Sequence, residues 1–354
     1  MFDRFDRYIA RNVLWAMLIA QVTLLSLDFL LSFINELGSA VKHYGPLQML
    51  TYLSMRLPWR FYGYIPVGVL LGGLLGLGGM VSSNELTAAR AAGRSLMRIV
   101  WGAMKPLLLV IAITMAVGEW IVPRTEQAAE AYQLERQKGV AAMSQAGGWQ
   151  TEGDDVYRFG TIRSDNTLLG VTRFSFSGHT LRSVTSAASA SWDDEHRQWT
   201  LHEVKQTDIG PEQTATSFTS TQRWQTAFSP DFLTLVLMEP NTQSISELWR
   251  YGRYLDHQSA DSHSVWLNFW QKALQPLALA GLLLVAASFV FGPLRSQAAG
   301  TRLFYGIMVG LVFKYTQDLL APSSILFHFP PLWAVLVPIA FCWLLGLMLL
   351  RRRG

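Results

Sequence analysis

Residues 61–81 read FYGYIPVGVLLGGLLGLGGMV, and this sequence indicates the fold class. It carries no charged side chain, and its length matches the roughly 20 residues with which an α-helix crosses the hydrocarbon core of a bilayer. Gly68, Gly72 and Gly76 recur at four-residue spacing and therefore share one helix face. Small residues in this pattern let membrane helices approach closely, so the stretch predicts a helix interface in lipid, either static or sliding.

Further apolar runs of similar length lie on both sides of this stretch, at 13–34, 99–122, 265–291, 303–320 and 331–350. The first of these runs lacks a convincing small-residue cleavage site, so we expect an uncleaved helix and not a signal peptide. Half of all residues are apolar, and this share alone does not distinguish a membrane protein from a soluble one. The clustering of the apolar residues near both ends of the chain indicates a membrane protein. The sequence predicts an α-helical membrane protein with six transmembrane helices.

Basic residues indicate the orientation of these helices. Lys and Arg collect at the N-terminus, in the loops 82–98 and 292–302, and at 351–353, whereas the connection 321–330 has none. Because such residues favour the cytoplasmic side, both termini are expected there, and the net charge of +4 reads as a topology signal and not as a nucleic-acid patch. The predicted partition is 1–122, an outer insert at 123–264, and 265–354.

The insert has the pattern of a β domain after an initial helix at 125–138. Alternating stretches are separated by turn residues such as Ser177-Gly178 and Gly210-Pro211, which predicts an antiparallel sandwich or open barrel of eight or more strands. Ser244 and Glu247 have capping-box spacing and predict a helix over 244–257. The stretches that alternate are 156–162, 168–176, 181–191, 199–204 and 214–228.

The loop that follows the glycine-rich stretch can form a short helix over 83–94. Ser83 is expected as its N-cap, Glu85 stands in the first turn, and Gly93 ends it. Such a helix is either a docking element for a soluble motor protein or a plain connector. The residues alone leave both interpretations open.

Signatures of enzyme chemistry were not found. No Lys-Ser or Lys-Thr follows the glycines, so they are not a phosphate-binding loop, and the chain is not expected to hydrolyse ATP. The seven His show no metal-ligand spacing, and Gly-x-Ser-x-Gly does not occur. Cys342 is the single cysteine, which excludes a disulfide framework within the chain. The alternatives to a transporter are a lipid-modifying enzyme and a scaffold that only binds partners.

Asp28 and Lys314 are charged residues inside apolar runs. Each follows the cytoplasmic end of its run by about 15 residues, so they are expected at similar depth. Intramembrane charges usually face a cavity or a partner. The two residues could contact a charged lipid head group or form a gate pair, or they could be a structural pair or extend to the outer interface.

Several motifs in the sequence form one specific combination. The C-terminal half contributes Gln275-Pro276-Leu277 and above all SFVFGPLRS at 288–296. The other motifs are Asp6-Arg7-Tyr8-Ile9, Gly118-Glu119-Trp120 with Pro123, Glu126-Gln127 and Ser244-Ile245-Ser246. Together they resemble one family, the LptF/LptG permeases, over essentially the whole chain.

The resemblance implies a subunit of an ABC transporter in the inner membrane of Gram-negative bacteria. The chain would pair with LptF, two copies of the ATPase LptB would use ATP and Mg to drive the pair, and LptC would add one helix and a periplasmic domain. The insert would be a periplasmic β-jellyroll that passes lipopolysaccharide toward LptC and the LptA bridge. This chain itself would bind no cofactor and catalyse no reaction.

The resemblance also implies site residues. The loop becomes a coupling helix with Glu85 as the best candidate for ATPase contact, together with Ser83, Leu86, Ala89, Arg90 and Gly93. The family's first helix carries substrate-facing lysines, but Ser32, Gly38 and Ser39 stand at those positions, and only Lys42 and His43 are basic nearby. The residues expected to contact lipid are Asp28, Phe29, Phe33, Lys42, Phe61, Tyr64, Phe304, Ile307, Leu311 and Lys314.

Overall fold

The computed structural model describes residues 4–38, 44–137, 148–163, 165–178, 180–210, 213–226, 228–257, 261–291, 297–327 and 329–352. The chain divides into two compact units. The helical unit comprises Met1–Leu31, Leu57–Trp120 and Leu248–Gly354. The sheet unit comprises Ser32–Arg56 and Ile121–Glu247.

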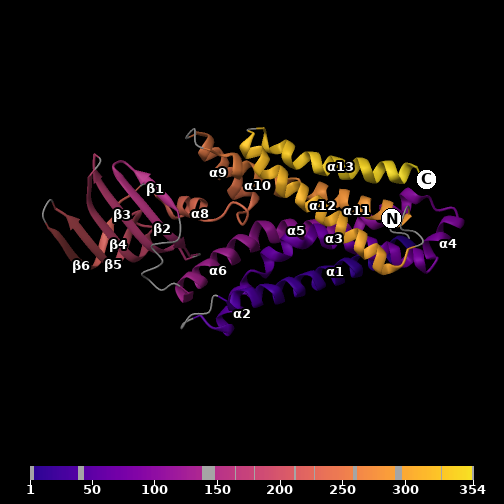
Figure 1. Cartoon of the computed structure of the whole chain (residues 1–354), viewed down its shortest axis with the longest axis horizontal. Coiled ribbons are helices and arrows are strands. Elements are labelled where there is room, and N and C mark those ends of the chain that lie inside the picture. Colours follow the sequence, from indigo (N-terminus) through magenta and orange to yellow (C-terminus); the bar gives the residue numbers. More distant parts are fainter. Residues whose placement is uncertain are drawn as a thin grey trace. The chain divides into compact units, whose positions relative to one another are not determined.

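The helical unit is built from long apolar helices that run alongside one another (Figure 1). Its sequence explains the length of these helices, because leucine, valine and alanine dominate and few polar residues interrupt them. Its elements are most of α1 (Arg4–Leu37), α3 (Leu57–Ser82), the short α4 (Glu85–Ala91), α5 (Leu96–Ala116), most of α9 (Ile245–His257), α10 (His263–Ala273), α11 (Gln275–Phe291), α12 (Ala299–Leu326) and α13 (Pro331–Arg351).

Four helical segments in the described part of the chain are long and apolar enough to cross a membrane, and the bent pair α10 and α11 would make a fifth. The four are α1, α3, the helix that starts with α5, and α13. The remaining predicted span, 303–320, is the fifth in chain order and forms part of the continuous helix α12. Lys314, Gln317 and Asp318 lower the mean hydropathy of this span. The structure therefore shows several membrane-type helices, and the count of six stays a prediction.

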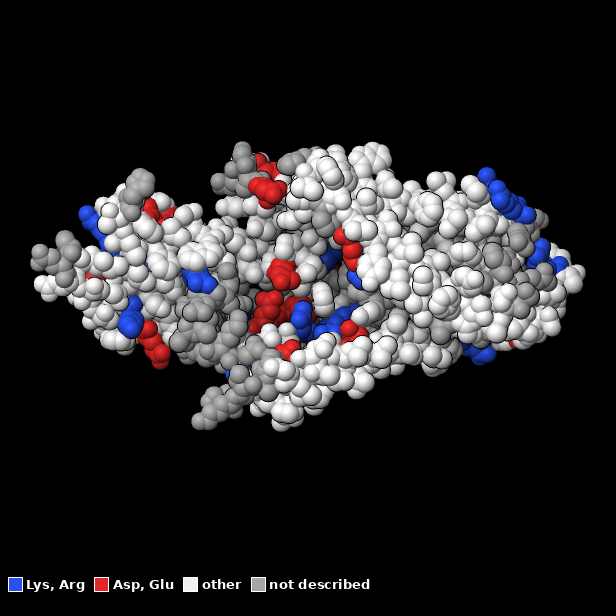
Figure 2. Space-filling view, viewed as in Figure 1, with Lys and Arg blue, Asp and Glu red and all other residues white. Residues whose placement is uncertain are grey.

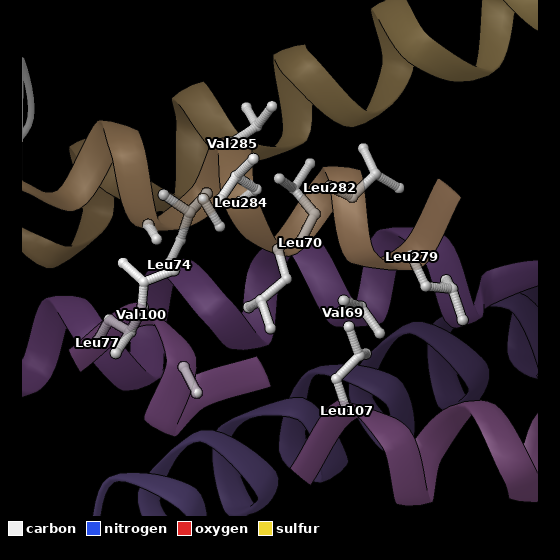
Figure 3. Packing of buried hydrophobic residues seen from close by; sticks show 14 of the residues in the cluster. Val69, Leu70, Leu74, Leu77, Val100, Leu107, Leu279, Leu282, Leu284 and Val285 are labelled. Atoms are coloured by element: carbon white, nitrogen blue, oxygen red, sulfur yellow. The ribbon is translucent and has the colours of Figure 1, made fainter. Parts of the chain in front are cut away.

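The core of the helical unit lies where α3, α5 and α11 meet. Leu70 and Leu74 of α3 and Leu282 of α11 are almost fully buried, and their side chains interdigitate (Figure 3). Leu107 of α5 closes the same cluster from the other side of α3. In lipid such packing is held by van der Waals contact, because the surrounding acyl chains are as apolar as leucine.

The helix that begins with α5 continues through a short π-helical segment, Val117–Ile121, into α6 (Val122–Gln137). Pro123 has no backbone N–H to donate to the preceding turn, which explains why the regular hydrogen-bond ladder changes here. The segment contains Gly118, where an added Cβ would lie 2.5 Å from the ring of Tyr62 in α3. Because Gly118 has no side chain, α3 can approach the irregular turn closely.

The sheet unit contains a six-stranded antiparallel sheet whose strands pair in sequence order. Consecutive strands lie side by side in Figure 1. The strands are β1 (Trp149–Glu152), β2 (Asp155–Ile162), β3 (Thr167–Ser177), β4 (Thr180–Asp193), β5 (Gln198–Ile209) and β6 (Thr214–Trp224). Each predicted alternating stretch overlaps one strand, so the prediction of a β domain is confirmed.

The expected eight or more strands are not found in the described residues, where the sheet has six. The reason is strand length, since β4 alone takes 14 residues and β5 takes 12. A segment of fixed length forms fewer strands when each strand is longer. The meander order shows an antiparallel sheet, and the jellyroll stays a prediction.

The apolar core of the sheet unit is rich in aromatic residues. Trp199 is fully buried, and its Nε1–H donates to the carbonyl oxygen of Phe228 at 2.7 Å. Tyr157 and Trp224 stack with ring centroids 5.2 Å apart. Short helices complete the unit, namely α2 (Pro46–Met55) and α8 (Pro230–Leu237). A buried indole contributes a large buried apolar area, and the hydrogen bond of its N–H group fixes the orientation of the ring.

The chain leaves the sheet unit through α9, whose start was predicted correctly. The backbone N–H of Glu247 donates to Ser244 Oγ at 3.2 Å, and the N–H of Ser244 donates to Glu247 Oε2 at 2.7 Å. These reciprocal bonds satisfy amides that the helix itself cannot pair.

Candidate coupling loop and charged clusters of the helical unit

The loop after α3 forms the short helix α4, seven residues long. Its N-cap is Asn84 in the left-handed region with φ 61°, so the prediction of Ser83 as N-cap was wrong. Ser83 instead donates through Oγ to Glu85 Oε1 at 2.9 Å. The physical reason is that α3 runs on to Ser82, which leaves Asn84 to make the reversal, and asparagine tolerates this conformation better than serine.

The end of α4 is a Schellman motif, as Gly93 had suggested. Gly93 has φ +89°, its N–H donates to the carbonyl of Arg90 at 2.9 Å, and the N–H of Arg94 donates to the carbonyl of Ala89 at 3.1 Å. Glycine adopts this φ without strain, and the two bonds satisfy the last carbonyls of the helix.

The side chains of α4 divide into an anchor and an exposed surface. Leu86 is buried and packs in the core of the helical unit, whereas Ser83, Arg90 and Gly93 are exposed. Glu85 and Ala89 are half-buried, and the Oε2 atom of Glu85 is buried without a hydrogen-bond partner among the residues that the structure describes. A carboxylate oxygen in this condition is suited to accept a donor from outside the chain.

A buried ion-pair cluster joins the start of α1 to this loop and to α5. Asp6 is 4% exposed, its Oδ1 lies 3.0 Å from Arg94 Nη1, and its Oδ2 lies 2.6 Å from Lys105 Nζ. Arg94 also lies over the ring of Phe5 at 4.8 Å. The motif that contains Asp6 did not indicate this cluster, because the two partners of Asp6 are 88 and 99 residues away in the sequence.

Asp28 and Lys314 do not pair with each other. Asp28 forms an ion pair with Arg60 of α3 and accepts a hydrogen bond from the hydroxyl of Tyr64 at 2.8 Å. Lys314 pairs with Asp318, one turn further along α12, at 3.1 Å. The similar depth expected for Asp28 and Lys314 therefore did not predict their ion-pair partners. Each charge is compensated by a nearby residue that the sequence pattern had not indicated.

Lys314 and Asp318 line a cavity between α3, α11 and α12. Gly63, Pro66 and Val67 of α3 form one wall, and Leu282 of α11 lies opposite. The α12 wall consists of Gly310, Phe313, Lys314, Gln317 and Asp318. This cavity combines an apolar lining with one ion pair, which suits an amphiphilic molecule.

The other residues expected to contact lipid fall into separate groups. Phe61 is half-buried against the core, as is Tyr64 beside Asp28, whereas Phe304, Ile307 and Leu311 form an exposed face of α12. Phe29 is half-buried in the helical unit, Phe33 is half-buried in the sheet unit, and Lys42 lies outside the described residues.

The glycine stripe of α3, formed by Gly68, Gly72 and Gly76, contacts α1. A Cβ added at Gly72 would collide with the backbone of Met17 in α1, and one at Gly76 would lie 3.0 Å from the Cα of Val13. At Gly68 the neighbour is Gln21, whose Nε2 donates to the carbonyl of Phe61 at 2.9 Å. The predicted helix interface at these glycines is confirmed, and its partner is α1.

The family model of the lipopolysaccharide export system permease LptF/LptG matches residues 7–352. The chain belongs to the LptF/LptG family. It is 34% identical to the lipopolysaccharide export system permease protein LptG of Escherichia coli strain K12, over 100% of this chain and 99% of that protein. It is 30% identical to LptG of Haemophilus influenzae, over 100% of each chain.

The match to LptF/LptG covers both units, including α4, the cavity beside α12 and the antiparallel sheet. The resemblance inferred from the sequence motifs is thereby confirmed. Two of those motifs now have a structural reason, since Asp6 forms the ion-pair cluster and Gly118 lies against Tyr62.

Proposed function

We propose that this chain is a permease subunit of an ABC transporter that extracts lipopolysaccharide from the inner membrane and passes it to a periplasmic protein bridge. The observation that carries the proposal is the full-length match to the LptF/LptG permease family, and the two relatives described above are named for lipopolysaccharide export. Membrane-type helices together with an antiparallel sheet agree with this role.

The proposed topology has six transmembrane helices, with α10–α11 and α12 supplying the fourth and fifth. Both termini and α4 are cytoplasmic, and the segment 123–264 is a periplasmic β-jellyroll to which β1–β6 belong. The domains are then 1–122, 123–264 and 265–354. The basic residues beside α4 and at the end of α13 support this orientation.

The proposed partners are LptF as the second permease, an LptB dimer as the ATPase, LptC, and the periplasmic LptA bridge. ATP and Mg are used by LptB, and this chain contributes no catalytic group. The physical need for such an assembly is clear, because exposing acyl chains to water costs about 0.8 kcal/mol per methylene. A continuous apolar path through membrane and periplasm avoids that cost.

We assign ATPase coupling to α4, with Glu85 as the main contact. Leu86 holds the helix to the core while Ser83, Arg90 and Gly93 are exposed. Glu85 is half-buried, and its unpaired Oε2 would gain a donor if α4 rearranged against LptB. The Schellman motif fixes the conformation at the C-terminal end of α4. The ion pair between Arg94 and Asp6 then joins this end of the loop to α1. Movement of α4 would therefore reach α1 directly.

The proposed lipid path uses α1, α3 and α12. Lys314 and the cavity that it lines offer a cation near apolar walls, and the exposed face formed by Phe304, Ile307 and Leu311 offers an apolar contact for acyl chains. Phe29, Phe33, Phe61 and Tyr64 belong to α1 and α3, and Asp28 is the compensated charge between those helices.

The test is lipopolysaccharide release from proteoliposomes that contain this chain, LptF, LptB and LptC, with wild type compared with Glu85→Arg. Reversing this charge at a half-buried contact should lower release and coupled ATPase activity about tenfold or more. The permease pair should still assemble, because the hydrogen bond that the structure shows for Glu85 lies within its own loop, where Glu85 accepts from Ser83 Oγ.

Glu195→Arg is the matched control, since it makes the same charge change in an exposed turn of the sheet unit. Its release should equal that of wild type. Equal release by Glu85→Arg and wild type would refute the coupling assignment, and no release from wild type would refute the proposed substrate.

A further inference from the structure

A pocket lies at the end of the helical unit where α4 ends, α5 begins and α13 ends. Three of its lining residues are arginines, namely Arg90, Arg94 and Arg351. Figure 2 shows basic side chains at the same end of this unit, where Figure 1 marks α4 and the C-terminus. The function proposed above uses Arg90 and Gly93 of this lining for ATPase coupling and gives the rest of the pocket no role.

The three arginines differ in how far their charge is compensated. Arg94 is bound to Asp6 and lies over Phe5. Arg90 and Arg351 are exposed, and no carboxylate within the described part of the chain pairs with either of them. The pocket therefore presents two uncompensated guanidinium groups, which bind phosphate oxygens in a fork geometry.

The start of α5 adds backbone donors to this positive charge. Ser95 is the N-cap, and its Oγ accepts the N–H of Arg98 at 3.4 Å. Leu96 and Met97 occupy the first turn, where backbone N–H groups have no acceptor inside the helix. The N-terminus of this 21-residue helix therefore reinforces the attraction for an anion.

The remaining wall of the pocket is apolar. Leu96, Val100 and Leu350 are 7%, 3% and 3% exposed and continue into the core of the helical unit. A free phosphate or nucleotide gains nothing from such a wall, whereas a phospholipid has acyl chains that fit against it. The pocket lies where α5 begins and α13 ends, and both helices belong to candidate membrane spans. A membrane crossed by these spans would place the pocket where lipid head groups meet acyl chains.

We propose that this pocket binds one anionic phospholipid, with its phosphate on Arg90, Arg351 and the start of α5, and an acyl chain against Leu96, Val100 and Leu350. The inference requires that these helices cross a membrane, and it is independent of the transported substrate. The bound lipid would join α4 and α13, so anionic lipid would steady the coupling loop.

The test is native mass spectrometry of the assembled exporter containing the full chain, with wild type compared with Arg351→Gln. Dioleoyl phosphatidylglycerol, dioleoyl phosphatidylethanolamine and inorganic phosphate are the probes. Wild type should retain one more phosphatidylglycerol than Arg351→Gln, and loss of one arginine should weaken that site about fivefold. Phosphatidylethanolamine should show no such difference, and inorganic phosphate should not displace the lipid.

Arg352→Gln is the matched control, because Arg352 neighbours Arg351 but does not line the pocket. It should retain phosphatidylglycerol like wild type. Equal retention by Arg351→Gln and wild type, equal retention of the two lipids, or displacement by phosphate alone would overturn the proposal. The readout needs neither lipopolysaccharide nor ATP, so it succeeds or fails separately from the transport assay.

Discussion

The charged residues within the membrane helices are held by partners on neighbouring turns and helices. Asp28 and Arg60 have side chains only 19% and 13% exposed, and Tyr64 donates a hydrogen bond to the same carboxylate. An ionised group in lipid is tolerated when it is paired and hydrogen-bonded in this way. The pair therefore fixes α1 against α3 near the beginning of α3.

A double-mutant cycle should detect this pair. Asp28→Asn and Arg60→Gln should each lower the free energy of unfolding, and their effects should be non-additive by about 1 to 2 kcal/mol because either change already breaks the ion pair. The measurement is thermal unfolding of the purified chain in detergent. Asp28→Asn combined with Lys314→Gln is the control, since Lys314 pairs with Asp318 instead. Additive effects of Asp28→Asn and Arg60→Gln would contradict the pairing.

Sequence reasoning identified the intramembrane charges but not their partners. Arg60 lies just before the predicted apolar run 61–81, yet α3 begins at Leu57 and carries Arg60 in its first turn. Asp6 is separated from Arg94 and Lys105 by most of α1 and by all of α2, α3 and α4. Side-chain pairing depends on helix rotation and on the residue at which each helix begins, and periodicity alone does not determine either to within one turn.

At the scale of helices, the α1–α3 contact depends on the absence of side chains on α3. Gly72 meets the backbone of Met17, and a backbone atom cannot move aside as a flexible side chain can. Close approach of this kind is how membrane helices gain packing energy without a hydrophobic driving force. The contact should therefore be sensitive to a single methyl group.

Gly72→Ala should lower the free energy of unfolding by about 1 to 3 kcal/mol, because the added Cβ forces α1 and α3 apart. Gly79→Ala is the matched control in the same helix, since nothing lies within 4 Å of its Cβ position. It should be neutral or slightly stabilising, because alanine favours helix more than glycine does. Thermal unfolding of both variants in detergent measures the difference. A similar loss of stability in both would show that the α1–α3 contact is not close in solution.

Elements with a strong local signal were predicted well. Each alternating stretch of the insert overlaps a strand, and Ser244 and Glu247 form the capping box that their spacing indicated. The described part of the insert has six strands and not eight, because β4 and β5 are longer than their alternation suggested. The π-helical segment before Pro123 also has no periodic signature, because it arises from a missing backbone donor and a close contact at Gly118.

At the scale of the whole molecule, the chain combines two cores of different chemistry. The core of the helical unit is built from aliphatic side chains such as Leu74 and Leu282. In the sheet unit, Tyr157, Trp199 and Trp224 belong to an aromatic core. Units with separate cores are expected to open separately, each with its own free energy.

Trp199→Ala should therefore weaken the sheet unit alone. Removing a fully buried indole that also donates to the carbonyl of Phe228 should lower the opening free energy of β2–β6 by about 3 to 5 kcal/mol. Hydrogen exchange of the full chain in detergent should show faster exchange in these strands and unchanged exchange in α3 and α11. Phe218→Ala is the control, because Phe218 is 77% exposed on β6 and should leave both units unchanged. Faster exchange in α3 and α11 of Trp199→Ala would instead mean that the two units unfold as one, because protection in the helices would then depend on a side chain that they do not contain.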